Sequence, residues 1–160
     1  MMKFLSIMAG WAFILIIILI IMLVASYLLQ AFSIYYVLKN LSYPEPLLAF
    51  IPFANMYALS SIVPSYNDGK VYVTATIGIK REVFKIWWLI AILVTMIPAV
   101  GWLLSLIIRI PCYTRIIQYV YSVFDKRREE DETILAIVSA IFPIIFFIRC
   151  LIYMFSKTRP

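Results

Sequence analysis

The sequence has no histidine and only two cysteines among its 160 residues. The lack of histidine excludes the usual catalytic triads, because their general base is an imidazole. Cys112 and Cys150 lie in or beside apolar segments and form no CxxC pair, so the sequence indicates neither a zinc site nor a disulfide framework. We therefore expect no catalytic residue, no metal and no cofactor.

Charged residues are also scarce, at 14% of the chain. A catalytic serine and lysine pair would need a desolvated lysine inside an apolar segment, whereas every lysine lies at the end of such a segment or in a polar stretch. The acidic run at residues 129–132 is interpreted as part of a solvated linker. The protein is therefore predicted not to be an enzyme.

Apolar residues, by contrast, are in large excess. They make up 65% of the sequence, and the mean hydropathy is +1.01, whereas soluble domains contain about 45–50% apolar residues. A hydrocarbon core of about 30 Å needs about 20 helical residues per crossing. The sequence therefore predicts an all-α integral membrane protein, with three to four transmembrane helices in a single membrane domain over residues 1–160.

The net charge of +6 comes from basic residues that are scattered between the apolar runs. Such scattering favours contact with anionic headgroups, whereas nucleic-acid binding calls for a clustered basic face. We expect the lipid bilayer to be a partner and nucleic acid not to be one.

The first half of the chain contains two apolar segments. A run without proline predicts a helix over about residues 5–38, which is longer than the bilayer is thick and must tilt or project. Residues 47–63 are also apolar, but they are few for a crossing and contain Pro52. We predict a re-entrant segment or a short helix there.

The second half predicts two further crossings, over residues 86–108 and 133–155, each with a proline inside. Pro98 and Pro143 are expected to break or kink these helices, because proline removes a backbone hydrogen bond. Pro52, Pro98 and Pro143 share a similar apolar context, and successive prolines of the three are separated by 46 and 45 residues. Chance similarity is the preferred explanation, and a repeated unit of the kind found in transporters is the alternative.

Three polar stretches separate or follow these segments. Residues 64–85 contain an Asn-Asp-Gly turn signal and then alternate between apolar and polar, which predicts a short hairpin or an extended loop. Residues 109–124 carry polar groups at helical spacing, so they form either an amphipathic interfacial helix or a packed continuation of the preceding helix. Residues 125–132 are interpreted as a charged linker.

Aromatic and basic residues near the ends of the predicted helices are assigned to the membrane interfaces. Tryptophan rings favour the headgroup level, and long basic side chains can reach it from within the bilayer. The residues with this assignment are Trp87, Trp88, Arg109 and Arg115.

Arg149 is the one charged residue inside an apparent crossing. An ionisable residue there is a functional candidate by default. The preferred interpretation is a side chain that extends to the interface. The alternative is an inward-facing site with Glu45 or Asp125 as the ion-pair partner.

Asn55 and Tyr57, close to Pro52, complete the candidate polar centre of the bundle. An amide at membrane depth needs hydrogen-bond partners, such as carbonyls freed by Pro52 or groups on another helix. We interpret these residues as structural, and contact with a ligand is the alternative.

Four short motifs follow one another along residues 47–155: Ile51-Pro52-x-x-Asn55-x-Tyr57, Trp87-Trp88, Ile97-Pro98 and Phe142-Pro143. In this order they resemble a family of small uncharacterised bacterial multi-pass membrane proteins with a hydrophobic-Pro-x-x-Asn-x-Tyr core. The chain departs from that pattern in its polar insertions at residues 64–84 and 125–132. The resemblance implies a location in the bacterial plasma membrane and carries no established activity.

Two hypotheses for the function follow. The preferred one is a non-enzymatic accessory or scaffold subunit, which assembles with itself or with a larger membrane complex through helix packing. The alternative is a small transporter or channel, in which proline-broken helices meet at the midplane and Asn55, Tyr57 and Arg149 line the path.

Overall fold

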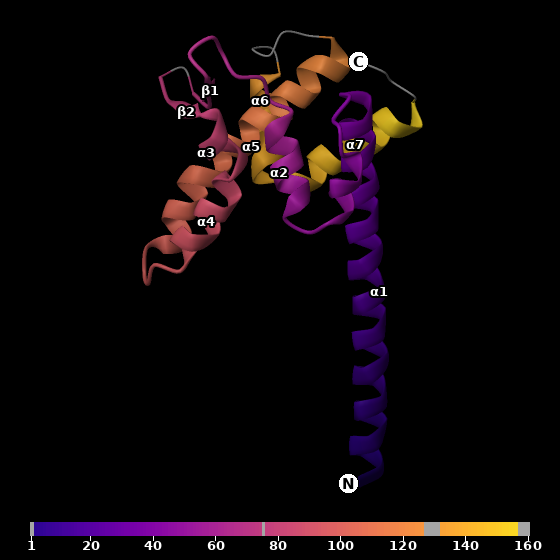
Figure 1. Cartoon of the computed structure of the whole chain (residues 1–160). Helices are drawn as coiled ribbons and strands as arrows, with labels where there is room; N and C mark the ends of the chain where they lie inside the picture. Colours follow the sequence, from indigo (N-terminus) through magenta and orange to yellow (C-terminus); the bar gives the residue numbers. More distant parts are fainter. Residues whose placement is uncertain (1, 75, 127–131, 157–160) are drawn as a thin grey trace.

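The computed structural model describes residues 2–74, 76–126 and 132–156, so residues 127–131 of the predicted linker lie outside it. The chain is mostly helical, at 74%, with one small sheet (Figure 1). Its elements are α1 (Met2–Asn40), the 3-10 helix η1 (Pro46–Phe50), α2 (Ala54–Ser61), β1 (Lys70–Tyr72), β2 (Gly78–Lys80), α3 (Arg81–Lys85), α4 (Trp87–Thr95), α5 (Gly101–Asp125), α6 (Thr133–Ile141) and α7 (Pro143–Phe155).

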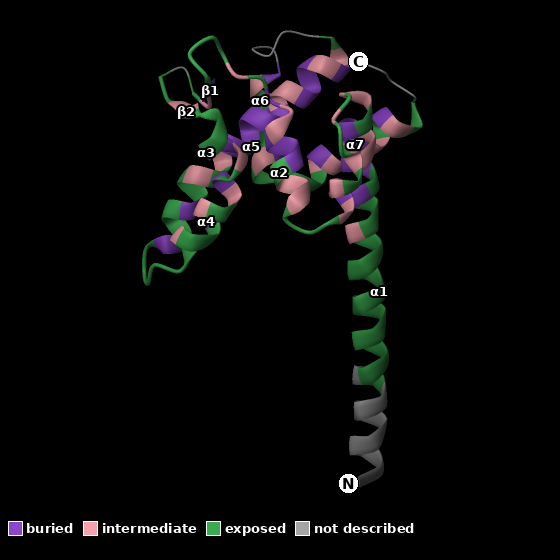
Figure 2. Ribbon diagram, viewed as in Figure 1, coloured by how far each residue is buried: buried purple, intermediate pink, exposed green. Residues whose placement is uncertain are grey.

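Helix α1 is continuous and projects far beyond the rest of the chain (Figure 1). No proline interrupts it, and its apolar side chains between Trp11 and Leu29 are largely exposed (Figure 2). Burial begins at Ala31, where the helix enters the body formed by the other elements. There η1 and α7 pack against it. The helix is thus an apolar rod with one end held in a folded body.

Helix α5 occupies the centre of that body and packs against α4 and α6. Its second half is almost wholly buried, and the largest fully buried side chains of the molecule include Ile116, Ile117, Tyr121 and Phe124 from this helix. The first turns of α5 carry exposed apolar residues instead. The polar face predicted for residues 109–124 therefore belongs to a packed continuation of a longer helix, and the interfacial alternative is wrong.

The prediction of one helix over residues 86–108 is also wrong, because the chain reverses near Pro98. Helix α4 ends at Thr95 and α5 begins at Gly101, and the two form a helical hairpin (Figure 1). The reversal brings the Cα of Gly101 so close to α4 that a Cβ there would lie 2.4 Å from the Val94 carbonyl oxygen. At 1.5 Å per residue, the nine residues of α4 rise only about 14 Å, less than half of a hydrocarbon core.

Pro52 and Pro143, which share the apolar context of Pro98, also lie where one helix ends and the next begins. Residues 133–155 divide at Phe142 into α6 and α7, which meet at a bend of 118°. Pro143 occupies the start of α7, a position that proline favours because its missing N–H has no helical partner there. Pro52 lies in the turn between η1 and α2, beside Phe53 with a φ of 66°.

Length and composition identify two helices in the described residues that could cross a membrane, namely α1 from Phe13 onward and α5. The bent pair α6 and α7 would be a third if it were one span.

Residues 64–85 include the short hairpin that their alternation indicates. Strands β1 and β2 pair antiparallel, with Val71 opposite Ile79. The turn is held by Asp68, which accepts hydrogen bonds from the Tyr72 hydroxyl at 2.8 Å and from the Lys70 N–H at 3.1 Å. These donors stabilise the carboxylate and lower the pKa of Asp68 below its usual 3.8. Helix α3, which the sequence did not indicate, follows the hairpin directly.

Replacing Gly101 with alanine tests the reversal between α4 and α5. The added methyl group would meet backbone oxygens of Val94 and Thr95, which cannot move without opening the hairpin. We expect Gly101→Ala to destabilise the protein by about 1–3 kcal/mol. A thiol-reactive fluorophore can follow thermal unfolding in detergent, because both free cysteines are buried.

The matched control is Gly78→Ala, whose methyl group would meet only the flexible side chains of Lys70 and Tyr72. We expect a much smaller effect there. Equal melting temperatures for the two variants would contradict the close approach at Gly101.

Candidate functional site

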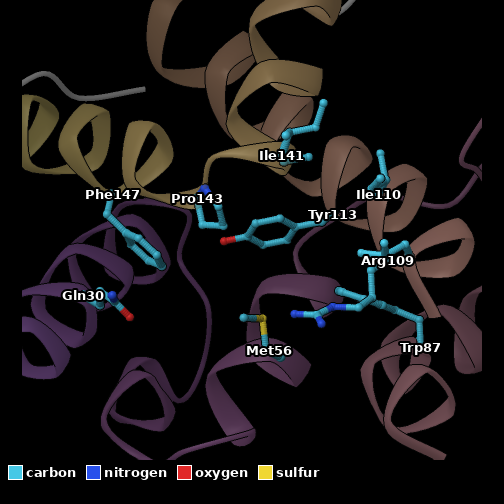
Figure 3. A pocket seen from close by; sticks show the side chains of 11 residues that line it. Gln30, Met56, Trp87, Arg109, Ile110, Tyr113, Ile141, Pro143 and Phe147 are labelled. Carbon is cyan, nitrogen blue, oxygen red and sulfur yellow. The ribbon is translucent and has the colours of Figure 1, made fainter. Parts of the chain in front are cut away.

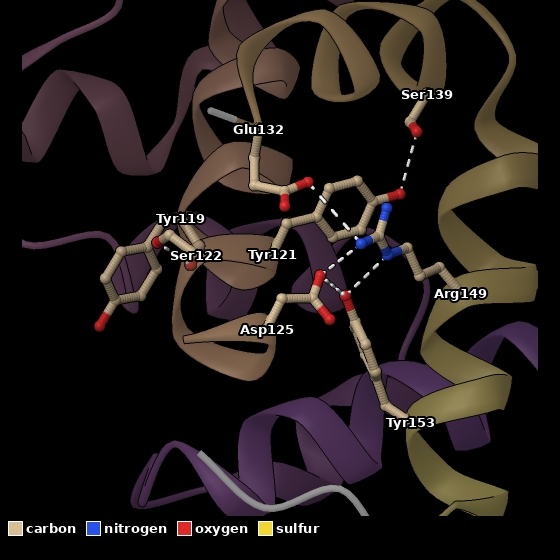
Figure 4. A network of polar contacts seen from close by, with 8 residues as sticks. All are labelled: Tyr119, Tyr121, Ser122, Asp125, Glu132, Ser139, Arg149 and Tyr153. Carbon is tan, nitrogen blue, oxygen red and sulfur yellow. Dashed lines mark hydrogen bonds and ion pairs between the residues drawn. The ribbon is translucent and has the colours of Figure 1, made fainter. Parts of the chain in front are cut away.

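A network of polar side chains surrounds Arg149 on α7 (Figure 4). The Nη2 of Arg149 donates to Oδ2 of Asp125 and lies 3.7 Å from Oε2 of Glu132. Its Nε donates to the Tyr153 hydroxyl at 2.9 Å, and that hydroxyl donates to Asp125 at 2.7 Å. The guanidinium also lies over the ring of Tyr121, 4.4 Å from its centre. One cation is thus held by two carboxylates, a phenol and an aromatic face.

The two carboxylates come from residues 125–132, for which the sequence predicts a solvated linker, and that prediction is wrong for both. Asp125 is the last residue of α5, and Glu132 directly precedes α6 with only 2% of its surface exposed. Lys126 adopts the left-handed conformation that commonly ends a helix. Because a buried carboxylate is costly unless paired, the guanidinium explains why these acids leave the solvent.

The network therefore corrects the preferred interpretation of Arg149, a side chain extended to the interface. The structure contains the alternative, an ion pair between Arg149 and Asp125. Both side chains remain partly accessible, with 24% of Arg149 and 20% of Asp125 exposed.

Further hydrogen bonds tie α5 to α6 beside this network. The Tyr121 hydroxyl and Ser139 Oγ lie 2.9 Å apart, and Gln118 donates to Thr133 Oγ1 at 2.7 Å. Arg115, predicted at the interface, is instead buried on α5, where its Nη1 donates to Gln118 at 3.4 Å. Gln118 and Tyr121 of α5 thus contribute to the packing of α5 on α6.

Asn55 does not lie in this polar centre. It is half-buried on α2, and within the described part of the chain its side chain makes no hydrogen bond. Tyr57, two residues further, is exposed. The expectation that Asn55 forms the polar centre is therefore wrong, because the polar centre is the site around Arg149. The tyrosines of this site and Ser139 cannot be distinguished in the sequence from ordinary core residues.

The two tryptophans assigned to an interface lie in different surroundings, and Trp87 is buried in the body. Trp87 is 5% exposed and donates from Nε1 to Ser60 Oγ at 3.0 Å, so it joins α4 to α2 inside the body. Trp88 is half-buried, and its ring stacks on Phe53 at a centroid distance of 5.6 Å. Adjacent helical residues point in different directions, so the two indoles meet different surroundings.

A cavity of about 380 Å³ opens where α1, α2, α4, α5, α6 and α7 come together (Figure 3). Most of its wall is apolar, and its polar groups come from Gln30, Arg109 and Tyr113. The other lining residues are Met56, Trp87, Leu106, Ile110, Ala140, Ile141, Pro143 and Phe147. Arg109 is exposed, and its assignment to an interface stays a prediction.

Two smaller cavities adjoin the first. One, of about 200 Å³, shares Met56, Trp87 and Arg109 with it. The other, of about 320 Å³, shares Gln30, Pro143 and Phe147. None of the three is lined by Asn55, Tyr57 or Arg149, so the structure does not bring those residues together around a common path.

Within the described ranges, no cluster of three or more metal-binding side chains is present. No protein-family model, curated protein or solved structure matches the chain. The geometry of the molecule is therefore the basis for inferring its function.

A double-mutant cycle tests the coupling of Arg149 and Asp125. We expect Asp125→Asn to lower the free energy of unfolding by about 2 kcal/mol, below the value for a fully buried pair because both groups are partly exposed. Arg149→Gln combined with Asp125→Asn should lose less than the sum of the single losses. Denaturant or thermal unfolding in detergent measures each value.

The pair of Lys85 and Glu82, at 2.8 Å and with the Glu82 side chain 80% exposed, provides the control. Glu82→Gln should change stability by no more than about 0.5 kcal/mol. Additive losses at Asp125 and Arg149 would show that the network is not a unit.

Proposed function

We propose that the protein is a non-enzymatic accessory or scaffold subunit of the cell membrane, anchored by α1. One observation carries this proposal: the apolar run of α1 makes almost no contact with the rest of its own chain. Exposing so much apolar surface to water would be strongly unfavourable. Lipid or the helix of another subunit is the environment in which such a surface is stable.

The body is proposed to dip into the same bilayer without crossing it. The hairpin of α4 and α5 points toward the side on which the N-terminus lies, and so does the turn between η1 and α2 (Figure 1). Both tips expose large apolar side chains: Ile51 and Phe53 on one, and Met96, Ile97, Val100 and Trp102 on the other. Because both apolar tips lie on the same side of the body as the apolar run of α1, we infer that they insert into the bilayer as re-entrant segments.

Helix α5 is long enough to cross, but its surroundings favour partial insertion. Its exposed apolar residues lie between Trp102 and Ile107, whereas its second half is packed inside the body and ends in the network at Asp125. We infer that α1 alone crosses, so the three to four crossings expected from composition reduce to one crossing and several re-entrant segments.

This topology makes the charge distribution informative about orientation. Lys3 is the only one of the 14 lysines and arginines that precedes the apolar run of α1. Because basic residues concentrate on the cytoplasmic side, the body is proposed to be cytoplasmic and the N-terminus to lie outside.

The same geometry favours a scaffold over a transporter. The charge of Arg149 is compensated by Asp125 and Glu132, and the cavities described above are lined by other residues. A helix that offers its apolar surface to the bilayer can bind a neighbouring helix by packing alone. The proposed partner is therefore a second copy or another membrane subunit.

Cysteine labelling tests the topology in a background with Cys112 and Cys150 replaced by alanine. Helix α2 and η1 are too short to cross, so Ser42→Cys and Ser65→Cys should react with an impermeant maleimide from the same, cytoplasmic side. Ser6→Cys should react from the other side. Labelling of residues 42 and 65 from opposite sides would show that residues 47–63 cross.

Photo-crosslinking tests the accessory role. A photoreactive amino acid at Leu19 or Leu23, both exposed on α1, should trap the same protein at both positions, either a second copy or one defined membrane partner. Reciprocal purification should recover the same pair. The exposed Tyr66 in the polar loop is the control position and should trap none of it. Adducts with lipid alone at every α1 position would rule out the accessory role.

A further inference from the structure

We propose that the cavity lined by Arg109, Tyr113 and Gln30 binds an anionic phospholipid, with its phosphate beside Arg109 and its acyl chains along the apolar walls. The inference rests on the proposed function, because the lipid would enter from the leaflet in which the body is embedded.

Helix α1 indicates the depth of the cavity in the bilayer. Trp11 and Gln30 are separated by 19 residues, or about 28 Å along a helix, close to the thickness of a hydrocarbon core. Tryptophan favours one interface, which places Gln30 near the other. Because Gln30 and Arg109 line the same cavity, the guanidinium lies at the level of the lipid headgroups.

Arg109 has the charge and the freedom that an anionic headgroup requires. Among the residues that the structure describes, it forms no ion pair, in contrast to Arg149 with its two carboxylates. The Tyr113 hydroxyl points into the cavity as a second donor (Figure 3), and no described residue forms a hydrogen bond with it. Guanidinium groups bind phosphate through charge-assisted hydrogen bonds, which makes phosphate a complementary ligand.

The apolar walls fit the hydrocarbon part of the same ligand. A volume of about 380 Å³ lies in the range of small-molecule sites. The adjoining cavities extend it past Trp88 on one side and past Leu151 on the other, which gives two acyl chains separate places. A fully apolar helix from a partner would leave the Arg109 charge uncompensated in this space, which disfavours such an occupant.

Tryptophan quenching by brominated lipids tests the site in the full-length protein. The chain has four tryptophans. One variant keeps Trp87, which lines the cavity, and a second keeps Trp102, which is exposed near the tip of the α4 and α5 hairpin; the other three become phenylalanine. Each is reconstituted in phosphatidylcholine vesicles that contain a minor fraction of dibrominated phosphatidylglycerol or of dibrominated phosphatidylcholine.

We expect the fraction of brominated lipid that half-quenches Trp87 to be about fivefold lower for the anionic lipid than for the zwitterionic one. One basic residue near the membrane surface supplies a preference of about this size. Trp102 should be quenched equally by both lipids. Arg109→Gln should abolish the preference at Trp87, whereas Arg109→Lys and the exposed Lys80→Gln should retain it. Protection of the two buried cysteines from a thiol-reactive dye verifies that each variant is folded.

The outcomes separate the inference from the proposed function. Absence of quenching at Trp102 with either lipid would overturn the membrane topology itself. Quenching at Trp102 without a lipid preference at Trp87, or a preference that survives Arg109→Gln, would overturn the lipid site alone. A dibrominated fatty acid that quenches Trp87 at a lower fraction than the phospholipid would assign the site to a carboxylate amphiphile and overturn the phospholipid.

Discussion

The contact between Arg149 and its two carboxylates is the interaction on which the folded body depends most. It joins the end of α5, the residue before α6 and the middle of α7, beside the stacked rings of Phe124 on α5 and Tyr153 on α7. A cation alone at this position would be unfavourable, and so would either acid. Pairing stabilises all three groups, so the network favours the path by which the chain returns after α5.

This dependence explains why local sequence patterns indicate the rod but not the polar centre. Uninterrupted apolar residues predict α1, and alternation indicates the β-hairpin, because both signals lie within a few consecutive residues. Asp125 and Arg149 are 24 residues apart, and the acid stands in a run of charges that reads as solvated. The apolar residues around Asn55 would look the same if its amide did lie at the polar centre, so the sequence pattern does not show that Asn55 lies elsewhere.

Proline alone also does not determine where a helix ends. Pro111 lies inside α5, and the helix continues through it. Near Pro98 the chain reverses, because Gly101 allows a backbone approach that any side chain would prevent. A single crossing and a short hairpin therefore share nearly the same composition. Hydropathy does not register the close backbone approach that Gly101 allows.

The continuity of α1 has a mechanical consequence for the whole molecule. Neither glycine nor proline occurs between Trp11 and Asn40, so the helix has no hinge between its free apolar run and the end on which η1 and α7 pack. Helices that cross bilayers of different thickness adjust their tilt. In the proposed topology, a tilt of α1 would be passed without a hinge as a rigid rotation to the body, whose orientation would then follow the thickness of the bilayer.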